Sequence, residues 1–261
     1  MKMNNKVNIS TLLLPDEIVR WIDNAAIYES SGQSGARTVY IDREDGAYLK
    51  IANRNTLYLA SKMQTYFSKH KMSSSVIRYL SSDRDYMITA ALQGEDGTAE
   101  CYLSEPERLS EVFGQSLRLL HEVEAVDCPI KDKMSDLLVM SGNIAFYQDH
   151  LDSISDYIGK ADAKNAASEI AAAGGLLIND VLIHGDYCLP NIMLKKWKLE
   201  GFIDVAGGGM GDRHYDLAWG LWTLNWNLKS QQYGQRFLDA YGWDCIDKER
   251  LRVCGLLAAM E

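Results

Sequence analysis

The chain has 261 residues, of which 47% are hydrophobic and 24% are charged, a composition typical of a globular protein with one large domain or two lobes. Its formal net charge of -9 disfavours nucleic acid and anionic membrane as partners and favours cationic ligands. The five cysteines form no Cys-x-x-Cys pair, which argues for free thiols and against a disulfide framework or a zinc site.

The N-terminal segment contains only three consecutive leucines before Pro15, a run too short for the core of a secretory signal. No other apolar run approaches the length of a membrane span, so we expect a cytoplasmic protein. Pro15, followed by Asp16 and Glu17, is typical of the first turn of a helix, where acidic residues meet the positive end of the helix dipole.

Two short β-prone runs follow at residues 36–42 and 47–52, joined by a segment that contains the turn-forming pair Asp45 and Gly46. A helix is predicted next, from residues at helical spacing: Leu59, Met63, Tyr66 and His70. Two more short strands are expected on either side of the segment SSDRD. This order of strands and helix predicts a small α+β unit that ends near Ala91.

From Ser104 onward the pattern becomes helical. Ser104 and Glu107 have the spacing of a capping box, with Pro106 in the first turn. A helix with one buried face is predicted by residues that recur in steps of three and four: Leu109, Val112, Phe113, Ser116, Leu117 and Leu120. We expect further helix through residues 131–173, broken at Gly174, then three brief strands, and two amphipathic helices at the end of the chain.

Polar residues follow two of these three strands in VLIHGDYCLPNIML and GFIDV. Asp186 comes after an apolar strand and His-Gly, and Asn191 lies five residues later, where the loop can fold back toward it. Asp204 ends a second apolar strand, thirteen residues further on. Phosphoryl transfer needs one carboxylate for the proton of the attacking hydroxyl, and an amide oxygen with a second carboxylate to hold Mg²⁺ against nucleotide phosphates.

An alternative interpretation is that these residues only form turns and helix caps, as Asp and Asn in loops usually do. An isolated His-Gly-Asp would favour that alternative. The joint pattern of His-Gly-Asp-x-x-x-x-Asn, a strand and then Ile-Asp is much more specific, and it favours the catalytic interpretation.

HGDYCLPN together with GFIDVAGGGMGDRHYDLA resembles the catalytic and metal-binding segments of the aminoglycoside 3'-phosphotransferases, within the kinase-like superfamily. AYLKI resembles the nucleotide-site lysine strand of that family, MITAALQGE its hinge, and LLHEVEAVDCPI its Leu-His and Cys-Pro segment. The resemblance implies a two-lobed, protein-kinase-like α+β fold. Residues 1–92 would form a small antiparallel-sheet N-lobe with one helix, and residues 93–261 a larger, mainly helical C-lobe.

The resemblance also implies roles for the matching residues of the C-lobe. Asp186 would be the catalytic base, and Asn191 and Asp204 would be the ligands of Mg²⁺. His184 and Asp216 would have a structural role and would fix the conformation of the catalytic loop.

In the N-lobe, the resemblance implies a site for ATP or GTP. Lys50 would reach the α- and β-phosphates, the Ser-Gly-rich loop around Ser34 would cover the phosphates, and backbone around Ala91 would bond adenine. The resemblance leaves open whether the protein is a monomer or a dimer.

The chain departs from the family pattern at three places. No Asp or Glu occurs in residues 51–82, so the helix after Lys50 lacks the glutamate that would pair with that lysine. The family's Gly-Arg after the metal-binding aspartate is Ala-Gly at residues 206–207, and its C-terminal acidic pair is replaced by Ala-Ala at residues 258–259. The first departure concerns nucleotide binding, whereas the other two concern the acceptor.

Other acids could still contact a cationic acceptor. Asp149, Asp152 and Asp156 lie where the related enzymes present acids to amino sugars, and we expect the last two to be one helical turn apart on one face. Together with Glu261, Asp152 and Asp156 are the candidate acceptor contacts. Charge patterning alone is equally consistent with a solvated helix face.

Three tryptophans, Trp219, Trp222 and Trp226, recur at spacings of three and four residues. Packing in the core is the favoured interpretation, because aromatic stripes on helices are usually buried. If they are exposed, they could instead stack on an apolar or sugar face.

The residue pattern predicts phosphoryl transfer, and the resemblance implies ATP-dependent O-phosphorylation of an aminoglycoside hydroxyl, which would give antibiotic resistance. One alternative is a kinase for another antibiotic, an amino alcohol or a metabolite. Another is a nucleotide-binding protein with weak or no turnover. A protein kinase is disfavoured because no long activation segment separates Asp204 from Asp216.

Overall fold

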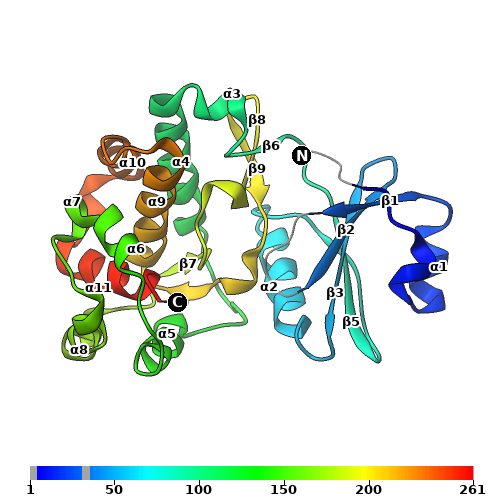
Figure 1. The fold of residues 1–261 in the computed structure, drawn as a ribbon, viewed down its shortest axis with the longest axis horizontal. Helices are drawn as coiled ribbons and strands as arrows, with labels where there is room; N and C mark the ends of the chain where they lie inside the picture. The colour runs from blue at the N-terminus through cyan, green and yellow to red at the C-terminus, as the bar shows by residue number, and fades with distance from the viewer. Residues whose placement is uncertain (1–4, 31–35, 261) are drawn as a thin grey trace. The chain divides into compact units, whose positions relative to one another are not determined.

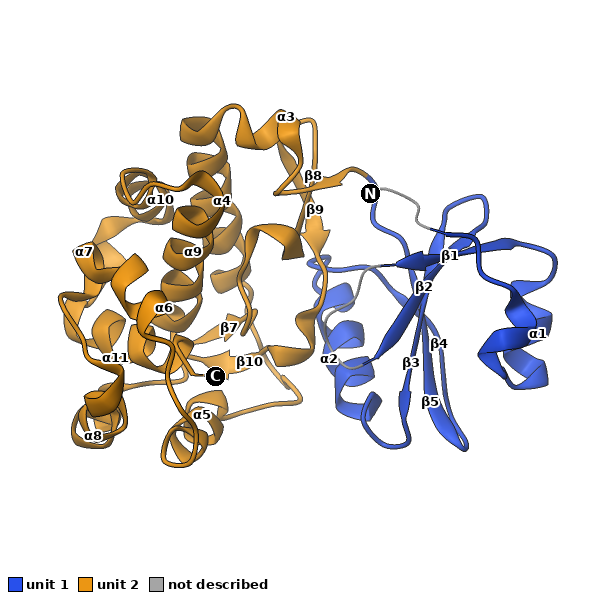
Figure 2. Cartoon of the chain, in the orientation of Figure 1, with its two compact units in different colours: residues 1–93 blue, residues 94–261 orange. Residues whose placement is uncertain are grey.

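The computed structural model describes residues 5–30 and 36–260. The chain divides into two compact units, residues 1–93 and 94–261, which Figure 2 colours separately. Ser34 and Glu261, two of the predicted site residues, lie outside the described residues. No helix among the described residues is long and apolar enough to cross a membrane.

The first unit is built on a five-stranded antiparallel sheet with the strand order β1-β2-β3-β5-β4 (Figure 1). Its elements are α1 (Asp16–Ile22), β1 (Ala26–Ser30), β2 (Arg37–Asp42), β3 (Ala47–Asn53), α2 (Tyr58–Lys69), β4 (Val76–Ser81) and β5 (Arg84–Ala90), with a short 3-10 helix at Ile9–Leu12. The four predicted strands and the predicted helix are confirmed, as is the helix that begins after Pro15. Strand β1 was not predicted.

Successive side chains of β3 point to opposite faces of the sheet, and this alternation determines which of them enter the core. Leu49 and Ile51 are buried in a cluster that includes Ile18 and Ile22 of α1. Lys50 lies between them in sequence and is only half-buried. Because successive side chains of a strand point to opposite faces, Lys50 lies on the face away from this cluster.

The second unit is mainly helical. Its elements are β6 (Glu95–Asp96), α3 (Glu100–Leu103), α4 (Pro106–His121), α5 (Lys133–Ser141), α6 (Gln148–Ser153), α7 (Ser155–Ile158), α8 (Ala163–Ala173), β7 (Val181–Ile183), β8 (Ile192–Lys195), β9 (Lys198–Phe202), β10 (Gly209–Gly211), α9 (Arg213–Leu228), α10 (Tyr233–Tyr241) and α11 (Lys248–Ala258). The strands form two small sheets, β6-β8-β9 and β7-β10.

Helices α4, α9 and α10 pack against one another, as Figure 1 shows, and α4 has the predicted buried face. Leu109, Phe113, Leu117 and Leu120 are each 0% exposed. The backbone of α10 passes so close to α4 that a Cβ built on Gly114 would lie 2.3 Å from the carbonyl oxygen of Phe237. Glycine at this position therefore permits the close packing of the two helices.

The predicted capping box at the start of α4 is wrong. Ser104 ends α3 instead, and its hydroxyl donates to the carbonyl oxygen of Cys101 at 3.4 Å. Glu105 occupies the N-cap position of α4, and its side chain makes no capping bond among the described residues. Pro106 is the first helical residue, as expected, because its missing N–H has no intrahelical partner to lose.

The end of the chain also differs from the prediction. Three helices, α9, α10 and α11, follow the last predicted strand, where two were expected. The predicted helical region 131–173 consists of four separate helices, α5 to α8.

Candidate active site

The loop after β7 begins with His184 and Gly185 and carries Asp186. Gly185 has a φ of +82°, and a Cβ built on it would lie 2.1 Å from the carbonyl oxygen of Gly207. Both the backbone conformation and the close approach require glycine. This contact brings the Asp186 loop against the segment that follows Asp204.

Both carboxylate oxygens of Asp186 accept hydrogen bonds from its own loop. The Asn191 side-chain amide donates to Oδ2 at 2.9 Å and to the Asp186 carbonyl oxygen at 2.9 Å. The Cys188 thiol donates to Oδ1 at 3.1 Å. Burial, together with the nearby charge of Asp186, raises the pKa of Cys188 well above its ordinary value, so the thiol keeps its proton and acts as a donor.

Asp204 is placed beside Asn191 by the hairpin of β8 and β9. Ile203 donates its backbone N–H to the carbonyl oxygen of Asn191 at 2.9 Å, so Asp204 follows directly after a residue bonded to Asn191. Asp204 is exposed and has a φ of +55°, a left-handed conformation that aspartate tolerates better than most residues. Asp186, Asn191 and Asp204 thus belong to two adjoining loops.

His184 connects these two loops through its ring. Its Nε2 lies 2.9 Å from the carbonyl oxygen of Ile203, and its Nδ1 lies 3.2 Å from the backbone nitrogen of Asp186. Because the backbone N–H of Asp186 is a donor, Nδ1 is the acceptor and Nε2 carries the proton. His184 is 0% exposed, so its ring is fixed between the loops.

The carboxylate of Asp216, on α9, fixes the backbone at the start of this loop by accepting two hydrogen bonds. Its Oδ2 accepts the backbone N–H of His184 at 2.6 Å, and its Oδ1 accepts that of Gly185 at 2.9 Å. His121 of α4 lies 3.2 Å from the same carboxylate through Nε2, and its Nδ1 lies 2.9 Å from the Tyr241 hydroxyl. Burial lowers the pKa of His121 despite the opposing effect of Asp216, so the ring stays neutral and donates through Nε2.

Two of the predicted nucleotide-site residues lie in the first unit. Lys50 lies on β3, opposite Thr38 of β2 and Met87 of β5. Ala91 follows β5, and its backbone N–H donates to the carbonyl oxygen of Gly46 at 3.2 Å. Ala91 would therefore bond to a nucleotide base as an acceptor, through its carbonyl oxygen.

Two acids of the first unit, Glu29 and Asp85, make well-defined contacts of their own. Glu29 pairs with Arg37 at 2.5 Å. The buried carboxylate of Asp85 accepts the backbone N–H of Leu57 at 2.8 Å and the hydroxyl of Ser81 at 2.6 Å, which fixes the start of α2.

Asp152 and Asp156 are exposed, but they do not share one continuous helix. Helix α6 ends at Ser153 and α7 begins at Ser155, with Ile154 between them at φ -119° and ψ 11°. Ile154 is buried, so the chain breaks where this apolar side chain enters the core. The two acids therefore belong to two short helices rather than to the single helix expected, and both remain at the surface.

The tryptophans of α9 are not in the core, contrary to the favoured interpretation. Trp219 and Trp222 are half-buried, and Trp226 is 60% exposed. Their helical spacing suggested a buried face, but the neighbouring positions Leu217, Leu221 and Leu224 supply the core side of α9 instead.

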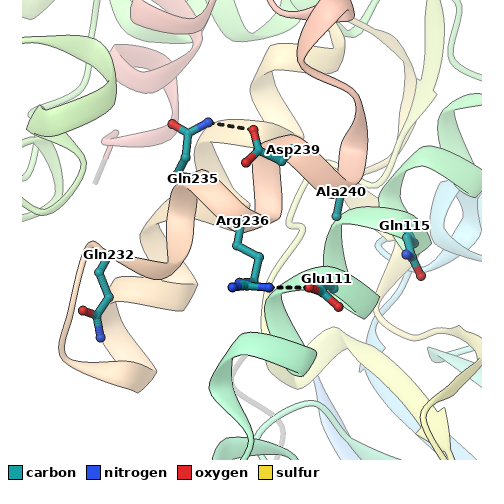
Figure 3. Close-up of a pocket in the computed structure, with 7 residues that line it drawn as sticks. All are labelled: Glu111, Gln115, Gln232, Gln235, Arg236, Asp239 and Ala240. Atoms are coloured by element: carbon teal, nitrogen blue, oxygen red, sulfur yellow. Dashed lines mark hydrogen bonds and ion pairs between the residues drawn. The ribbon is translucent and has the colours of Figure 1, made fainter.

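A polar depression of about 530 Å³ lies between α4 and α10 and is distinct from the predicted site residues (Figure 3). Arg236 pairs with Glu111 across it at 2.5 Å, and Gln235 donates to Asp239 at 2.8 Å. The polar side chains that line the depression are therefore largely bonded to one another.

No group of three or more His, Cys, Asp or Glu side chains suited to a metal occurs in residues 5–30 and 36–260. A magnesium site in a phosphotransferase needs fewer protein ligands, since nucleotide phosphates and water complete the octahedron. The Asn191 amide nitrogen donates to Asp186, so its amide oxygen is the atom left for a cation. Asn191 and Asp204 therefore fit a two-residue magnesium site.

Cys188 and Thr223 also contact this site but were not predicted. Cys188 is part of the recognised motif, yet its role as a donor to Asp186 depends on a loop conformation that the motif does not specify. Thr223 of α9 accepts the backbone N–H of Leu189 at 3.2 Å and so fixes the middle of the loop. Only tertiary structure brings Thr223 to this loop, so no local sequence signal could have identified it.

The antiparallel sheet unit, the helical unit and the Asp186 loop define a kinase-like phosphotransferase. The chain belongs to the Phosphotransferase enzyme family, whose profile matches residues 30–254. It is 42% identical to a probable aminoglycoside 3'-phosphotransferase of Lactococcus lactis over 252 residues, which cover 96% of this chain and 95% of that protein. An aminoglycoside 3'-phosphotransferase of Niallia circulans is 26% identical over 94% of this chain and 97% of its own length.

Solved structures show the same fold. A crystal structure of aminoglycoside-3'-phosphotransferase of type VIII has a TM-score of 0.69 at 18% identity and covers 98% of this chain and 93% of its own. An aminoglycoside phosphotransferase from Streptomyces rimosus in complex with ADP and streptomycin has a TM-score of 0.65 at 21% identity, with 87% and 92% covered. The predicted kinase-like fold is confirmed, and the chain is a small-molecule kinase.

Proposed function

We propose that this protein transfers the γ-phosphoryl group of ATP to a hydroxyl of an aminoglycoside antibiotic, in the cytoplasm, and so confers resistance. The observation that carries the proposal is the Asp186 loop, in which both carboxylate oxygens are held by Asn191 and Cys188. The 42% identity to a relative named a probable aminoglycoside 3'-phosphotransferase supports the choice of acceptor.

In this proposal, Asp186 accepts the proton of the acceptor hydroxyl. The hydroxyl oxygen forms a bond to the γ-phosphorus while the bond from that phosphorus to the bridging oxygen of ADP breaks. Because the transition state of phosphoryl transfer is loose, catalysis depends mainly on positioning and charge stabilisation. The hydrogen bonds to both oxygens of Asp186 supply this positioning, and Asp216 and His184 hold the backbone on which it depends.

Nucleotide binding is assigned to the first unit, residues 1–93. Lys50 would reach the phosphates, the loop around Ser34 would cover them, and the carbonyl oxygen of Ala91 would accept a bond from adenine. Mg²⁺ would be held by the amide oxygen of Asn191 and the carboxylate of Asp204, and when bound it would neutralise charge on the phosphates. The second unit, residues 94–261, would supply Asp186 and the acceptor contacts, including Asp152, Asp156 and Glu261.

A coupled ADP-release assay against aminoglycosides, amino alcohols and macrolides tests this proposal. We expect release of ADP that depends on an aminoglycoside such as kanamycin or neomycin, with a product that carries a new phosphate ester. Turnover of an amino alcohol or a macrolide, with none of any aminoglycoside, would assign the enzyme to another acceptor. The absence of turnover with every class would favour a nucleotide-binding protein without kinase activity.

A further inference from the structure

An ordered stack of three aromatic rings runs along one side of α9. The imidazole of His150, from α6, lies 5.1 Å from the ring of Trp222 at an interplanar angle of 11°. Trp222 in turn stacks on Trp226 at 5.8 Å and 19°. Trp219 contacts His150 and Trp222 edge-on at 5.4 Å each. These contacts hold Trp226 in one orientation, although that residue lies at the exposed end of the stack.

The indole ring of Trp226 already contacts a cation of the same chain. The Lys229 ammonium lies 4.6 Å from the centroid of the Trp226 ring, within the range of a cation–π interaction. Lys229 is exposed, and in the described part of the chain its ammonium forms no ion pair with a carboxylate. The contact shows that the exposed ring can receive an ammonium group.

This end of α9 is close to both the catalytic loop and the surface acids. Thr223, between Trp222 and Trp226 in sequence, accepts the backbone N–H of Leu189 from the Asp186 loop at 3.2 Å. Gln231, two residues after Lys229, bonds to the backbone of Asp156 at 3.4 Å and of Asp152 at 3.5 Å. The turn after α9 is therefore joined to the segment that carries two exposed carboxylates.

We propose that Trp226 binds an ammonium group of the acceptor, and that Lys229 is an internal cation that occupies the ring when no acceptor is bound. This inference rests on the proposed function, because it assumes an acceptor that carries amino groups. Binding would displace the Lys229 ammonium from the ring, and the Asp152 and Asp156 carboxylates would add a longer-range attraction for the same charge. An uncharged acceptor would gain nothing from this exchange, so the site selects for cations.

The size of the effect is limited by competition between the two cations. A cation–π interaction at an exposed site corresponds to about a two- to five-fold change in affinity. Removing Lys229 should therefore tighten binding of a cationic acceptor by about this factor. Removing the Trp226 ring should weaken binding by the full factor only when Lys229 is absent. In wild type the loss should be smaller, because the acceptor gains only the difference between its own interaction with the ring and that of Lys229.

The chain offers a matched control at another exposed tryptophan. Trp243 is 43% exposed, and the Lys248 ammonium lies 5.9 Å from its ring centroid. This pair has the same two residue types but lies in the turn before α11, without a second tryptophan stacked on it in the described residues. Trp243→Phe and Lys248→Gln therefore report general effects of losing an exposed indole or a positive charge.

The test is isothermal titration of kanamycin into the protein without nucleotide, for wild type, Trp226→Ala, Trp226→Phe, Lys229→Gln, the Trp226→Ala/Lys229→Gln double variant and the two controls. We expect two- to five-fold tighter binding for Lys229→Gln, a small loss for Trp226→Ala and a smaller one for Trp226→Phe, and a larger loss when Trp226→Ala is added to Lys229→Gln. In the Trp226→Ala background, Lys229→Gln should no longer tighten binding, since competition requires the ring. The controls should bind as wild type does.

Two results would overturn the inference while leaving the proposed function intact. One is a folded Lys229→Gln variant that binds kanamycin no more tightly than wild type does. The other is tighter binding for Lys229→Gln that persists without the Trp226 ring, which would mean that Lys229 acts only through its charge. Failure of wild type to phosphorylate any aminoglycoside would instead reject the proposed function, and this inference with it.

Discussion

The Asp186 carboxylate is held by two side chains that differ in donor strength. Asn191 supplies an amide N–H at 2.9 Å, whereas Cys188 supplies a thiol, which is a weak donor. The thiol is buried and keeps its proton, so it can orient the carboxylate without competing for the substrate proton. Cys188 is thus a positioning residue for Asp186.

Replacing Cys188 with alanine should lower kcat by roughly three- to ten-fold and leave KM for ATP nearly unchanged, because a net hydrogen bond contributes about 1 kcal/mol. Cys188→Ser should restore most of the activity, since a hydroxyl can donate to the same oxygen. Steady-state kinetics of the three proteins test this. Equal kcat for wild type and Cys188→Ala would show that Asn191 alone is sufficient to orient Asp186.

His150 gives a prediction about stability and pH. Burial lowers its pKa from 6.5 to about 4, and its Nε2 has no hydrogen-bond partner among the described residues. The folded pKa lies below the unfolded one, so the native state binds fewer protons between pH 6.5 and 4. Stability should therefore fall as the pH falls through this window, by about 3 kcal/mol in total.

The measurement is the free energy of unfolding of wild type and His150→Phe at pH 7 and pH 4. A phenyl ring can keep the stack on Trp222 but cannot take up a proton. The variant should lose less stability than wild type on acidification. An identical loss in both proteins would mean that His150 is not the group responsible.

Much of the site at the residue scale could be predicted, because Asp186, Asn191 and Asp204 lie within nineteen residues of one another in two loops that adjoin recognisable strands. The short hairpin of β8 and β9 between them brings their backbones together, through hydrogen bonds such as that from Ile203 to Asn191. The supporting bonds from His121 and Thr223 could not be predicted, since these residues come from distant helices that reach the loop only after folding.

At the scale of elements, the packing of α4 on α10 depends on Gly114. A methyl group there would lie 2.3 Å from the carbonyl oxygen of Phe237 and 3.0 Å from the Cβ of Ala240, so the helices would have to separate. Gly114→Ala should destabilise the protein by about 1–3 kcal/mol, the usual range for overpacking, although alanine favours helix formation.

Chemical unfolding of Gly114→Ala against wild type tests this packing. Gly142→Ala is the control, because Gly142 also lies at a helix, with a φ of -75°, and the nearest atom to its added Cβ is 3.9 Å away. The control should be neutral or slightly stabilising. A Gly114→Ala variant as stable as the control would contradict the close approach of α4 and α10.

Elements with a strong local pattern were predicted well, and those that depend on distant contacts were not. The hairpin of β2 and β3 has alternating apolar residues and a glycine turn, and α4 has a long apolar stripe. Strand β1 is short and acquires its register only by pairing with β2. The break at Ile154 and the exposure of Trp226 depend on which side of each helix meets the core, which helical spacing alone does not determine.

For the whole molecule, the net charge of -9 and the proposed cationic acceptor agree in sign. Lys50 and Ala91 belong to the first unit, whereas Asp186, Asn191 and Asp204 belong to the second. Under the proposed function, the first unit supplies contacts to the nucleotide, and the second unit supplies the catalytic base and the ligands of Mg²⁺. Loss of Asp186 should therefore abolish transfer without preventing nucleotide binding.

The most direct test of this account is single-turnover transfer of labelled γ-phosphate from ATP to kanamycin, in wild type, Asp186→Ala and the control Asp239→Asn. Asp239 is an exposed acid on α10 whose carboxylate accepts a hydrogen bond from Gln235 of the same helix. We predict that Asp186→Ala lowers the transfer rate by at least about 10³-fold while ATP still binds, because the carboxylate acts mainly in the transition state. Asp239→Asn should transfer at the wild-type rate, and a folded Asp186→Ala variant with near wild-type transfer would contradict the account.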